Sequence, residues 1–435
     1  MELRCTDLAN ATGGRLDGPD VAVNGASIDS RSIVPGQLFV PVVAERDGHA
    51  FVVAALARGA SAYLTSAPSQ GGSAIVVDDT LVALQSAGRL ARSTLADATP
   101  VVGVTGSLGK TSVKDLLAAV LSGRLRTAAS ERSFNNELGV PLTLLNTPDG
   151  TEAVVVEMGA RDAGHIADLC AIAAPTIGIV TRVAAVHTEI FGTIDDVARA
   201  KGELVRALPA SGTAVLNAGD DRVAAMAAET DATVVTYGNG GAVHATDIAL
   251  DDSLRARFHL RSPWGDAEVL LGARGVHQVE NALAAAAAAL VCGLSLEDVV
   301  SGLATGVLSP WRMELTTTPS GAVVLNDAYN ANPTSMAAAL EALAAVPAER
   351  RVAVLGVMAE LGEGSDAAHM VIGTLAARHD IRVIAVDAPG YGGEDVPDIE
   401  AALAALGPLT EGDAVLVKGS RVAQLERLAA RLMAG

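Results

Sequence analysis

Short runs of apolar residues alternate with segments of helical periodicity through the middle of this chain. The apolar runs lie at residues 101–104, 153–156, 177–181 and 214–216, and the helix-like segments lie at 111–121, 163–171, 195–208 and 280–292. Strands that are apolar along their whole length are buried on both faces, and their alternation with helices is typical of a mostly parallel sheet. The pattern therefore predicts an α/β domain over residues 98–309, with a small antiparallel insert at 246–271.

The two ends of the chain have patterns of their own. Residues 310–435 again show apolar runs that alternate with helical segments, and we expect strands at 323–325, 352–356, 383–386 and 414–417. This alternation is typical of a smaller doubly wound, Rossmann-like domain. Residues 1–97 hold shorter strand-like runs at 38–43 and 74–77 and a helix-like run at 50–59, and residues 95–100 read as a linker. We therefore predict three α/β domains, at 1–97, 98–309 and 310–435.

Composition narrows the classes of function. The 435 residues are 50% apolar and 19% charged, and the net charge of −19 argues against nucleic acid or an anionic membrane as a general partner. The three isolated cysteines, Cys5, Cys170 and Cys292, and a first segment without a signal-peptide layout lead us to expect a cytoplasmic protein. The longest apolar run, 282–294, is shorter than a membrane span, so we expect no membrane insertion.

Residues 103–112, Gly-Val-Thr-Gly-Ser-Leu-Gly-Lys-Thr-Ser, carry the strongest chemical signal. They connect an expected strand to an expected helix, which is the setting of a phosphate-binding loop. Glycines let backbone N–H groups converge on phosphate oxygens, Lys110 adds positive charge, and Thr111 is a possible ligand of Mg2+. The strict spacing places a glycine six residues before the lysine, where this chain has Val104. The segment therefore predicts a variant phosphate-binding loop for ATP or GTP.

Glu157 and His187 are expected at the same edge of the sheet as this loop. Glu157 ends the apolar run that starts at residue 153, and His187 follows the run 177–181. Open α/β sheets bind ligands at the carboxyl ends of their strands, where an acid reaches nucleotide phosphates through Mg2+. The residue pattern alone leaves two alternatives open, a solvated acid at a strand end and a structural histidine.

Lys201 interrupts an apolar stripe. The segment 195–208 places Val197, Leu204 and Leu208 on one helical face, with Lys201 in the middle of that face. A lysine there either extends its amine to solvent or has a function. Burial lowers the pKa of an amine, and a neutral amine can react with CO2 to give an anionic carbamate. Periodicity alone favours the first interpretation.

Asp327 lies in the polar, turn-prone segment 326–336, which follows an expected strand and precedes a helix. An acid at this position can bind the hydroxyl groups of a ribose. The alternative is a turn rich in Asn and Asp, with Thr334 or Ser335 capping the next helix.

Arg312 and the segment 418–421 are candidates for anion binding. Arg312 lies at the predicted junction of the second and third domains, where ligand sites and interdomain ion pairs both occur. Residues 418–421, Lys-Gly-Ser-Arg, follow an expected strand and open an expected helix at 422–433. They predict either an anion site at the start of a helix or a simple turn capped by Ser420.

Together these segments resemble the bacterial Mur ligases and, within that family, the MurF type, over nearly the whole chain. The loop 105–111 matches the family's own glycine spacing, and residues 133–142 look like its second motif. Glu157, His187 and Lys201 fall on its Mg2+ and carbamylated-lysine positions. The segments that match other family motifs are 29–31, 36–39, 47–49, 277–283, 327–336, 358–362 and 417–421. The Asp-Asn-Pro-Arg segment of the diaminopimelate-adding relatives does not occur.

Three positions depart from the family pattern. Arg182 stands where the family usually has asparagine, close to the metal position. Val357 stands where an aspartate is usual, and Gln278 replaces the asparagine of a common His-Asn-Val segment. These departures leave the phosphate loop and the acidic and basic residues named above in place.

The resemblance implies a UDP-binding domain, a central P-loop ATPase-like domain and a C-terminal Rossmann-like domain. It implies ATP, two Mg2+ ions and a carbamate on Lys201 as cofactors. The implied ATP contacts are Thr105, Gly106, Ser107, Gly109, Lys110, Thr111, Ser112, Asn281 at the adenine, Arg312 at the γ-phosphate and Asp327 at the ribose. The implied metal ligands are Thr111, Glu157, His187 and Lys201. The implied catalytic residues are Lys110, Glu157, His187, Lys201 and Arg312, and the implied substrate contacts are Ser30, Arg31, Asn136, Lys418 and Arg421.

The activity that the resemblance implies is an ATP-dependent, ADP-forming amide ligation in peptidoglycan precursor synthesis. The substrates would be UDP-N-acetylmuramoyl-tripeptide and D-alanyl-D-alanine, joined through an acyl phosphate, and we expect a monomer. Two alternatives stay open at this point. One is another ligase of the same superfamily, such as a folylpolyglutamate-type enzyme. The other is a nucleotide-binding paralogue without catalytic activity.

Overall fold

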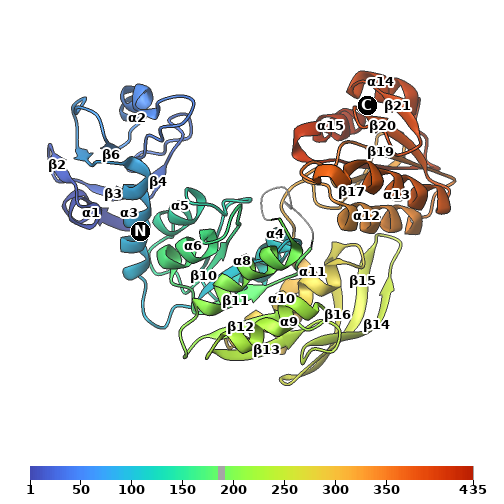
Figure 1. The fold of residues 1–435 in the computed structure, drawn as a ribbon, viewed down its shortest axis with the longest axis horizontal. Helices are drawn as coiled ribbons and strands as arrows, with labels where there is room; N and C mark the ends of the chain where they lie inside the picture. Colours follow the sequence, from blue (N-terminus) through green and yellow to red (C-terminus); the bar gives the residue numbers. More distant parts are fainter. Residues whose placement is uncertain (185–191, 435) are drawn as a thin grey trace. The chain divides into compact units, whose positions relative to one another are not determined.

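The computed structural model describes residues 1–184 and 192–434, which form two compact units (Figure 1). The first unit contains Met1–Arg182, Ala198–Leu216 and Asp220–Val235. The second contains the other described residues, most of which follow residue 235. Both units are built from α/β layers, as the alternation of apolar runs and helical segments predicts.

A small sheet with flanking helices forms the N-terminal part of the first unit. Its elements are β1 (Glu2–Arg4), α1 (Cys5–Thr12), β2 (Arg15–Asp17), β3 (Ala22–Asn24), β4 (Ala26–Ser27), β5 (Leu38–Phe39), η1 (Gly48–Phe51), α2 (Val52–Ala57), β6 (Ala62–Thr65), β7 (Ala74–Val76) and α3 (Thr80–Ser93). The strands follow the order β2-β7-β6-β5-β4, in which β4 to β7 are parallel. The strand predicted over 38–43 ends at Phe39, shortly before Pro41, which has no N–H for a sheet ladder.

The central sheet is parallel at every pairing for which the register is known. Its elements are β8 (Val101–Thr105), α4 (Lys110–Ser122), β9 (Thr127–Ala129), α5 (Gly139–Leu145), β10 (Ala153–Glu157), α6 (His165–Ala173), β11 (Ile177–Val180), α8 (Ile194–Arg206), β12 (Thr213–Asn217), α9 (Asp221–Ala225), η2 (Met226–Glu229) and β13 (Thr233–Tyr237). The strand order is β13-β12-β11-β8-β10-β9, so β8 lies inside the sheet between β11 and β10. The strands and helices predicted here from the apolar runs are confirmed within about two residues.

An antiparallel sheet and a buried helix begin the second unit. The elements are β14 (His244–Leu250), β15 (Arg255–Ser262), β16 (Gly265–Arg274), α10 (Gln278–Val291) and α11 (Leu296–Thr305). The pairing β14-β15-β16 is antiparallel, which confirms the predicted insert. Helix α10 is buried along its alanine-rich run 282–290, because small side chains let neighbouring elements approach closely.

A doubly wound sheet completes the second unit. Its elements are β17 (Glu314–Thr317), β18 (Val323–Asn326), α12 (Pro333–Ala345), β19 (Arg350–Leu355), η3 (Gly362–Gly364), α13 (Ser365–Arg378), β20 (Arg382–Val386), β21 (Glu394–Val396), α14 (Ile399–Leu406), β22 (Asp413–Lys418), η4 (Arg421–Ala423) and α15 (Glu426–Ala434). The order is β17-β18-β22-β19-β20-β21, parallel except for β17. One apolar core joins the sheet to α12 and α13, and another joins its opposite face to α14 and α15.

Two predicted helix starts in this sheet are corrected. The helix expected at 422–433 begins at Glu426, because Gln424 has a left-handed backbone (φ 50°) that ends the short turn η4. The residue that caps α12 is Asn332, whose side chain accepts the N–H of Ser335, while the Ser335 hydroxyl lies 3.1 Å from the N–H of Asn332. Ser335 is thus the second member of a capping box and not the cap itself.

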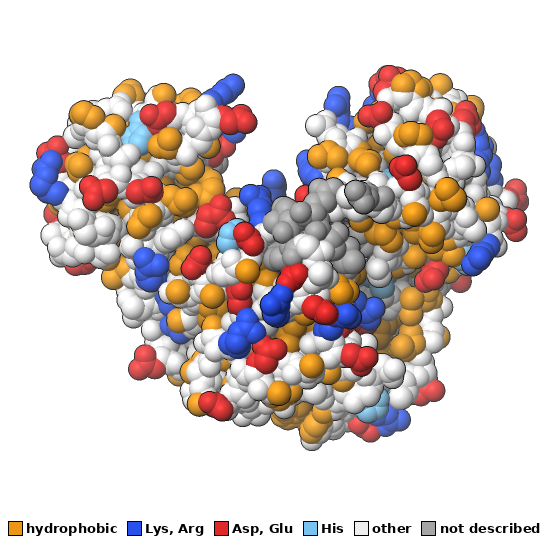
Figure 2. All heavy atoms as spheres, in the orientation of Figure 1, with side chains coloured by type: hydrophobic (Ala, Val, Ile, Leu, Met, Phe, Trp, Pro, Cys, Tyr) orange, Lys and Arg blue, Asp and Glu red, His pale blue; other side chains and the backbone are white. Residues whose placement is uncertain are grey.

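Charged side chains are mixed on the face drawn in Figure 2, where the described Lys and Arg residues lie scattered among Asp and Glu. None of the described helices combines the length and the apolar character needed to cross a bilayer.

Candidate active site

The predicted phosphate loop connects β8 to α4. Gly106 has φ 140°, and a Cβ atom there would lie 1.9 Å from Oγ1 of Thr181, so only glycine fits. Gly109, with φ 81°, precedes the first residue of α4. Val104, which breaks the strict motif, is fully buried in β8. The irregular spacing therefore reflects a strand that runs two residues further before the loop begins.

Lys110 closes this loop on itself. Its Nζ donates to the carbonyl oxygens of Gly106, at 2.8 Å, and Ser107, at 3.4 Å. The N–H of Ser107 donates to the carbonyl of Arg182, so the unusual Arg182 supports the loop through its backbone. Lys110 and the loop N–H groups are thus gathered at the carboxyl end of β8, the arrangement that binds phosphate groups in α/β proteins.

Glu157 ends β10, the strand next to β8, and its side chain is 1% exposed. Oε1 accepts a hydrogen bond from Nδ2 of Asn135 at 2.8 Å. Oε2 is buried and has no hydrogen-bond partner among the described residues. A buried carboxylate oxygen without a donor is unfavourable, and a hard cation such as Mg2+ is a fitting partner for it. Thr111, 4% exposed, offers a hydroxyl in the first turn of α4.

Lys201 is buried in α8, where its side chain is 3% exposed. Val197, Leu204 and Leu208 are buried with it, which confirms the predicted stripe and excludes a solvated amine. The pKa of Lys201 is lowered from 10.5 to about 7, mainly by burial and also by the positive charge of Lys110, while Glu203 opposes both effects. The amine is therefore partly neutral at neutral pH and lies within electrostatic reach of the loop lysine.

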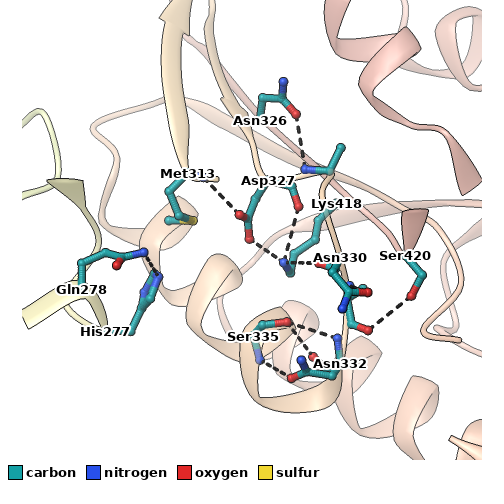
Figure 3. A network of polar contacts seen from close by, with 12 residues as sticks. His277, Gln278, Met313, Asn326, Asp327, Asn330, Asn332, Ser335, Lys418 and Ser420 are labelled. Carbon is teal, nitrogen blue, oxygen red and sulfur yellow. Dashed lines mark hydrogen bonds and ion pairs between the residues drawn. The ribbon is translucent and has the colours of Figure 1, made fainter. Parts of the chain in front are cut away.

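Asp327 and Lys418 form an ion pair at the carboxyl edge of the C-terminal sheet (Figure 3), in which Lys418 is buried and the Asp327 side chain is 14% exposed. Lys418 Nζ lies 2.5 Å from Asp327 Oδ2 and also donates to the carbonyl of Asn330 at 2.9 Å. Asp327 Oδ1 accepts the N–H of Met313 at 3.1 Å. Lys418 is 2% exposed, so its amine, which the sequence predicted at a substrate, is engaged inside the domain.

Two arginines near this edge stack on aromatic rings. The Arg312 guanidinium lies 4.1 Å from the centre of the Tyr329 ring, and that of Arg421 lies 4.6 Å from the Trp311 ring. Arg421 also pairs with Glu426 at 2.5 Å. The Nε of Arg312 is buried without a hydrogen-bond partner among the described residues. Stacking fixes the plane of each guanidinium, which leaves its edge to bind an anion.

The segments at 356–362 and 418–421 are joined to the Asp327 loop by hydrogen bonds. Ser420 Oγ accepts the N–H of Ala359 and lies 3.3 Å from the carbonyl of Ala331, so Ser420 bridges two loops and does not cap a helix with its side chain. The N–H of Ser420 donates to the carbonyl of Val357, so this departure from the family pattern also acts through its backbone. The three loops form one layer at the end of the sheet.

Asn281 lies in the first turn of α10, where its Nδ2 donates to Oε1 of Gln278 at 2.8 Å. In the N-terminal sheet, Arg31 pairs with Asp29 at 2.8 Å, and this pairing lowers the pKa of Asp29 to about 2. Arg31 is largely exposed, and Ser30 lies beside it in the same turn. Asn136 accepts the N–H of Gly139 through Oδ1, at the start of α5.

The predicted residues fall into separate groups. In the first unit, the loop 105–112, Glu157 and Lys201 gather at the carboxyl edge of the central sheet. In the second unit, Arg312, Asp327, Lys418 and Arg421 gather at the carboxyl edge of the C-terminal sheet. His187 lies outside the described residues.

Two residues that sequence reasoning missed support the first group. Asn135 contacts Glu157 directly. Lys114, 3% exposed, donates to the carbonyls of Ser130 and Arg132 and thereby holds the loop that carries Asn135. The sequence could have pointed to Lys114, because this residue, like Lys201, is a lysine among the apolar positions of a predicted helix.

Comparison with known proteins places these sites in a family. Residues 104–289 match the Mur ligase middle domain, and residues 311–421 match the Mur ligase, glutamate ligase domain. A UDP-N-acetylmuramoyl-tripeptide–D-alanyl-D-alanine ligase of Mycobacterium tuberculosis is 40% identical over 100% of this chain and 98% of its own length.

Solved structures agree with that similarity. A crystal structure of MurF from Acinetobacter baumannii has a TM-score of 0.90 and 32% identity, covering 100% of this chain and 99% of its own. A MurF ligase from Thermotoga maritima in complex with ADP has a TM-score of 0.82 and 27% identity, covering 95% and 97%. The three-domain α/β architecture of those proteins is therefore shared. The chain belongs to the Mur ligase family, in the branch of the MurF ligases, and is an ATP-dependent ligase of peptidoglycan precursor synthesis.

Proposed function

We propose that this enzyme joins D-alanyl-D-alanine to UDP-N-acetylmuramoyl-tripeptide. The γ-phosphate of ATP is transferred to the terminal carboxylate of the tripeptide, which gives an acyl phosphate and ADP. The amine of the dipeptide then attacks the acyl carbon, the amide bond forms, and inorganic phosphate leaves with the C–O bond electrons. The full-length similarity to ligases named for these two substrates supports the choice of substrates.

The observation that carries the proposal is the free Oε2 of Glu157 at the same sheet edge as the phosphate loop. Thr111, Glu157, His187 and Lys201 are the residues that would hold Mg2+, which supplies positive charge between the two anionic reactants. No three His, Cys, Asp or Glu side chains cluster as a metal site among residues 1–184 and 192–434. Thr111 and Glu157 would hold one ion, and His187 and Lys201 would help to hold a second, with phosphate and water oxygens as further ligands.

The chain's own residues position and neutralise the phosphates. When ATP binds, the amine of Lys110 leaves the carbonyls of Gly106 and Ser107 and contacts phosphate oxygens instead. The other loop residues, Thr105, Gly109 and Ser112, surround the same phosphates. Arg312 binds the γ-phosphate through the guanidinium edge that stacking on Tyr329 leaves open. Asn281 contacts adenine and Asp327 contacts ribose.

Lys201 acts, in this proposal, as a carbamate. Its neutral amine attacks CO2, a C–N bond forms, and one proton is released, which leaves an anionic group in place of a cation. The lowered pKa supports this step, because only the neutral amine has the electron pair that attacks carbon. The anion would offset the positive charge of Lys110 and the metal.

The remaining assignments concern substrate and organisation. Ser30 and Arg31 bind the UDP group, and Asn136 and Arg421 face the peptide substrates. Lys418 acts indirectly, because its amine holds Asp327 and the Asn330 carbonyl. We place the domains at 1–97, 98–309 and 310–435. The two family matches, at 104–289 and 311–421, lie on either side of residue 310 and support the second boundary. We further propose a cytoplasmic monomer.

Phosphate release from ATP tests the function. The full chain is assayed with UDP-N-acetylmuramoyl-tripeptide and D-alanyl-D-alanine, each alone and both together. We expect sustained release only with both substrates, together with the UDP-N-acetylmuramoyl-pentapeptide as product. Release that needs neither substrate, or that proceeds with glutamate and a folate in their place, would overturn the proposal.

A further inference from the structure

Gln278 is a buried glutamine whose amide is engaged at both ends. It is the first residue of α10 and is 3% exposed. Its Nε2 contacts Nε2 of His277 (Figure 3) at a distance of 3.0 Å, and its Oε1 accepts a hydrogen bond from Nδ2 of Asn281 at 2.8 Å. Buried amide groups are unfavourable unless paired, so these two contacts fix which way the Gln278 amide points.

His277, Gln278 and Asn281 form a relay of two hydrogen bonds, and the chemistry of the three side chains decides which atom donates in each bond. An amide nitrogen donates and does not accept, so Gln278 is the donor to His277, and Nε2 of His277 is the acceptor. With the Gln278 amide in this orientation, the proton of the neutral imidazole is on Nδ1, which is buried and has no hydrogen-bond partner among the described residues. Burial and the charge of Lys418 lower the pKa of His277, against the effect of Asp327, which agrees with a neutral ring. The Gln278 carbonyl consequently faces Asn281 and requires an N–H from it.

The relay determines which hydrogen-bonding groups of the Asn281 amide remain available for a ligand. One of its two N–H groups is used by Gln278, so one N–H donor and the Oδ1 acceptor remain. Adenine offers the complementary pair, an N7 acceptor beside the N6 amino donor, whereas guanine offers two acceptors, N7 and O6. If the amide of Asn281 rotated by half a turn, its nitrogen and oxygen would exchange places, and this distinction would weaken.

We propose that Gln278 is a positioning residue that fixes the amide of Asn281 and thereby sets the preference for adenine over guanine nucleotides. The inference rests on the proposed contact between Asn281 and adenine. Gln278 stands where the family pattern has an asparagine, so the longer side chain reaches both His277 and Asn281 in a way particular to this chain.

The test is nucleotide selectivity in the full-length enzyme. We compare kcat/KM for ATP and GTP with both peptide substrates present, and the Kd of ADP and GDP by calorimetry. Gln278→Met removes both relay contacts at nearly constant volume, and we expect its ATP-to-GTP ratio to fall about 10-fold, with kcat at saturating ATP within about 3-fold of wild type. Glu280→Gln is the matched control, because Glu280 lies in the same helical turn but contacts Asn217. Its ratio should not change.

A second variant keeps the proposal open to contradiction if Gln278→Met does not fold. Gln278→Glu still accepts from Asn281, and a shift of the imidazole proton to Nε2 lets His277 donate to the second carboxylate oxygen. The variant should therefore retain the ratio, and a ratio as low as that of Asn281→Ala would overturn the relay. An unchanged ratio in folded Gln278→Met would also overturn it, whatever happens to kcat or stability. If Asn281→Ala itself keeps the wild-type ratio, the adenine contact fails, and the proposed function is then the part that needs revision.

Discussion

The two sheet edges that carry the candidate site each contain a buried lysine, and the two lysines have different surroundings. Lys201, in the first unit, is 3% exposed, and its charged neighbour Lys110 repels the protonated form. Lys418, in the second unit, is 2% exposed and lies 2.5 Å from the carboxylate of Asp327. At similar burial, desolvation and Lys110 disfavour the ammonium of Lys201 against the effect of Glu203, whereas the ammonium of Lys418 contacts a carboxylate.

This difference separates a reactive amine from a structural one. A buried ammonium with a carboxylate partner keeps its charge and holds nearby groups in place. A buried ammonium beside another cation tends to lose its proton and becomes a nucleophile. In our proposal, the same residue type at similar depth supports chemistry in the central domain and holds the Asp327 loop in the C-terminal domain. Substitution of each lysine tests whether the contrast is real.

The largest effect is expected from Lys201→Met. Methionine fills the apolar site without an amine, so the fold should persist while turnover falls by a factor of about 1,000 or more, because the proposed carbamate cannot form. Activity is measured as phosphate release with both substrates, and folding by circular dichroism. Lys201→Ala should lose activity equally. Turnover near the wild-type rate in either variant would contradict the carbamate role.

The second effect is a loss of stability in Lys418→Met. Removing the ammonium leaves the carboxylate of Asp327 buried without its partner, which should lower the free energy of unfolding by about 3–5 kcal/mol. The matched control is Arg382→Met, at the pair of Arg382 in β20 with Glu394 in β21. Both side chains of this pair are exposed, at 41% and 49%, so a smaller loss is expected. Urea denaturation measures both variants, and equal losses would remove the contrast that burial predicts.

The sequence predicted the Lys201 environment better than that of Lys418, for a physical reason. The stripe around Lys201 is a local property of one helix, and helical periodicity reports local burial. The partner of Lys418 is Asp327, which is 91 residues away in the chain, and no local pattern encodes such a contact. The same limit explains Asn135, whose contact with Glu157 spans 22 residues.

The same limit applies to the prediction of the fold, where features encoded by local sequence patterns were predicted and others were not. Apolar runs predicted β8, β10, β11 and β12 of the central sheet and β18, β19, β20 and β22 of the C-terminal sheet, because strands buried on both faces must be apolar. They missed β9, β13, β17 and β21, which are less buried. The start of α15 was predicted wrongly, since the left-handed backbone of Gln424 has no signal in residue type. The roles given to Ser30, Arg31 and Asn136 stay predictions.

The third expected effect is a pH dependence of stability that belongs to Lys201. Its pKa is about 7 in the folded chain and near 10.5 when unfolded, so between these values the unfolded state binds a proton that the folded state does not. The free energy of unfolding should therefore rise with pH across this window, by at most about 1.4 kcal/mol per pH unit, and the penalty is fully present below pH 7. Lys201→Met lacks this penalty, so its stability advantage over wild type should be largest at pH 7 and shrink towards pH 10. Denaturation in CO2-free buffer at pH 7, 8.5 and 10 measures the difference in free energy of unfolding between Lys201→Met and wild type. The contributions of the other titrating groups cancel in this difference. A constant difference would mean that Lys201 keeps its proton when buried, and the contrast between the two lysines would then be lost.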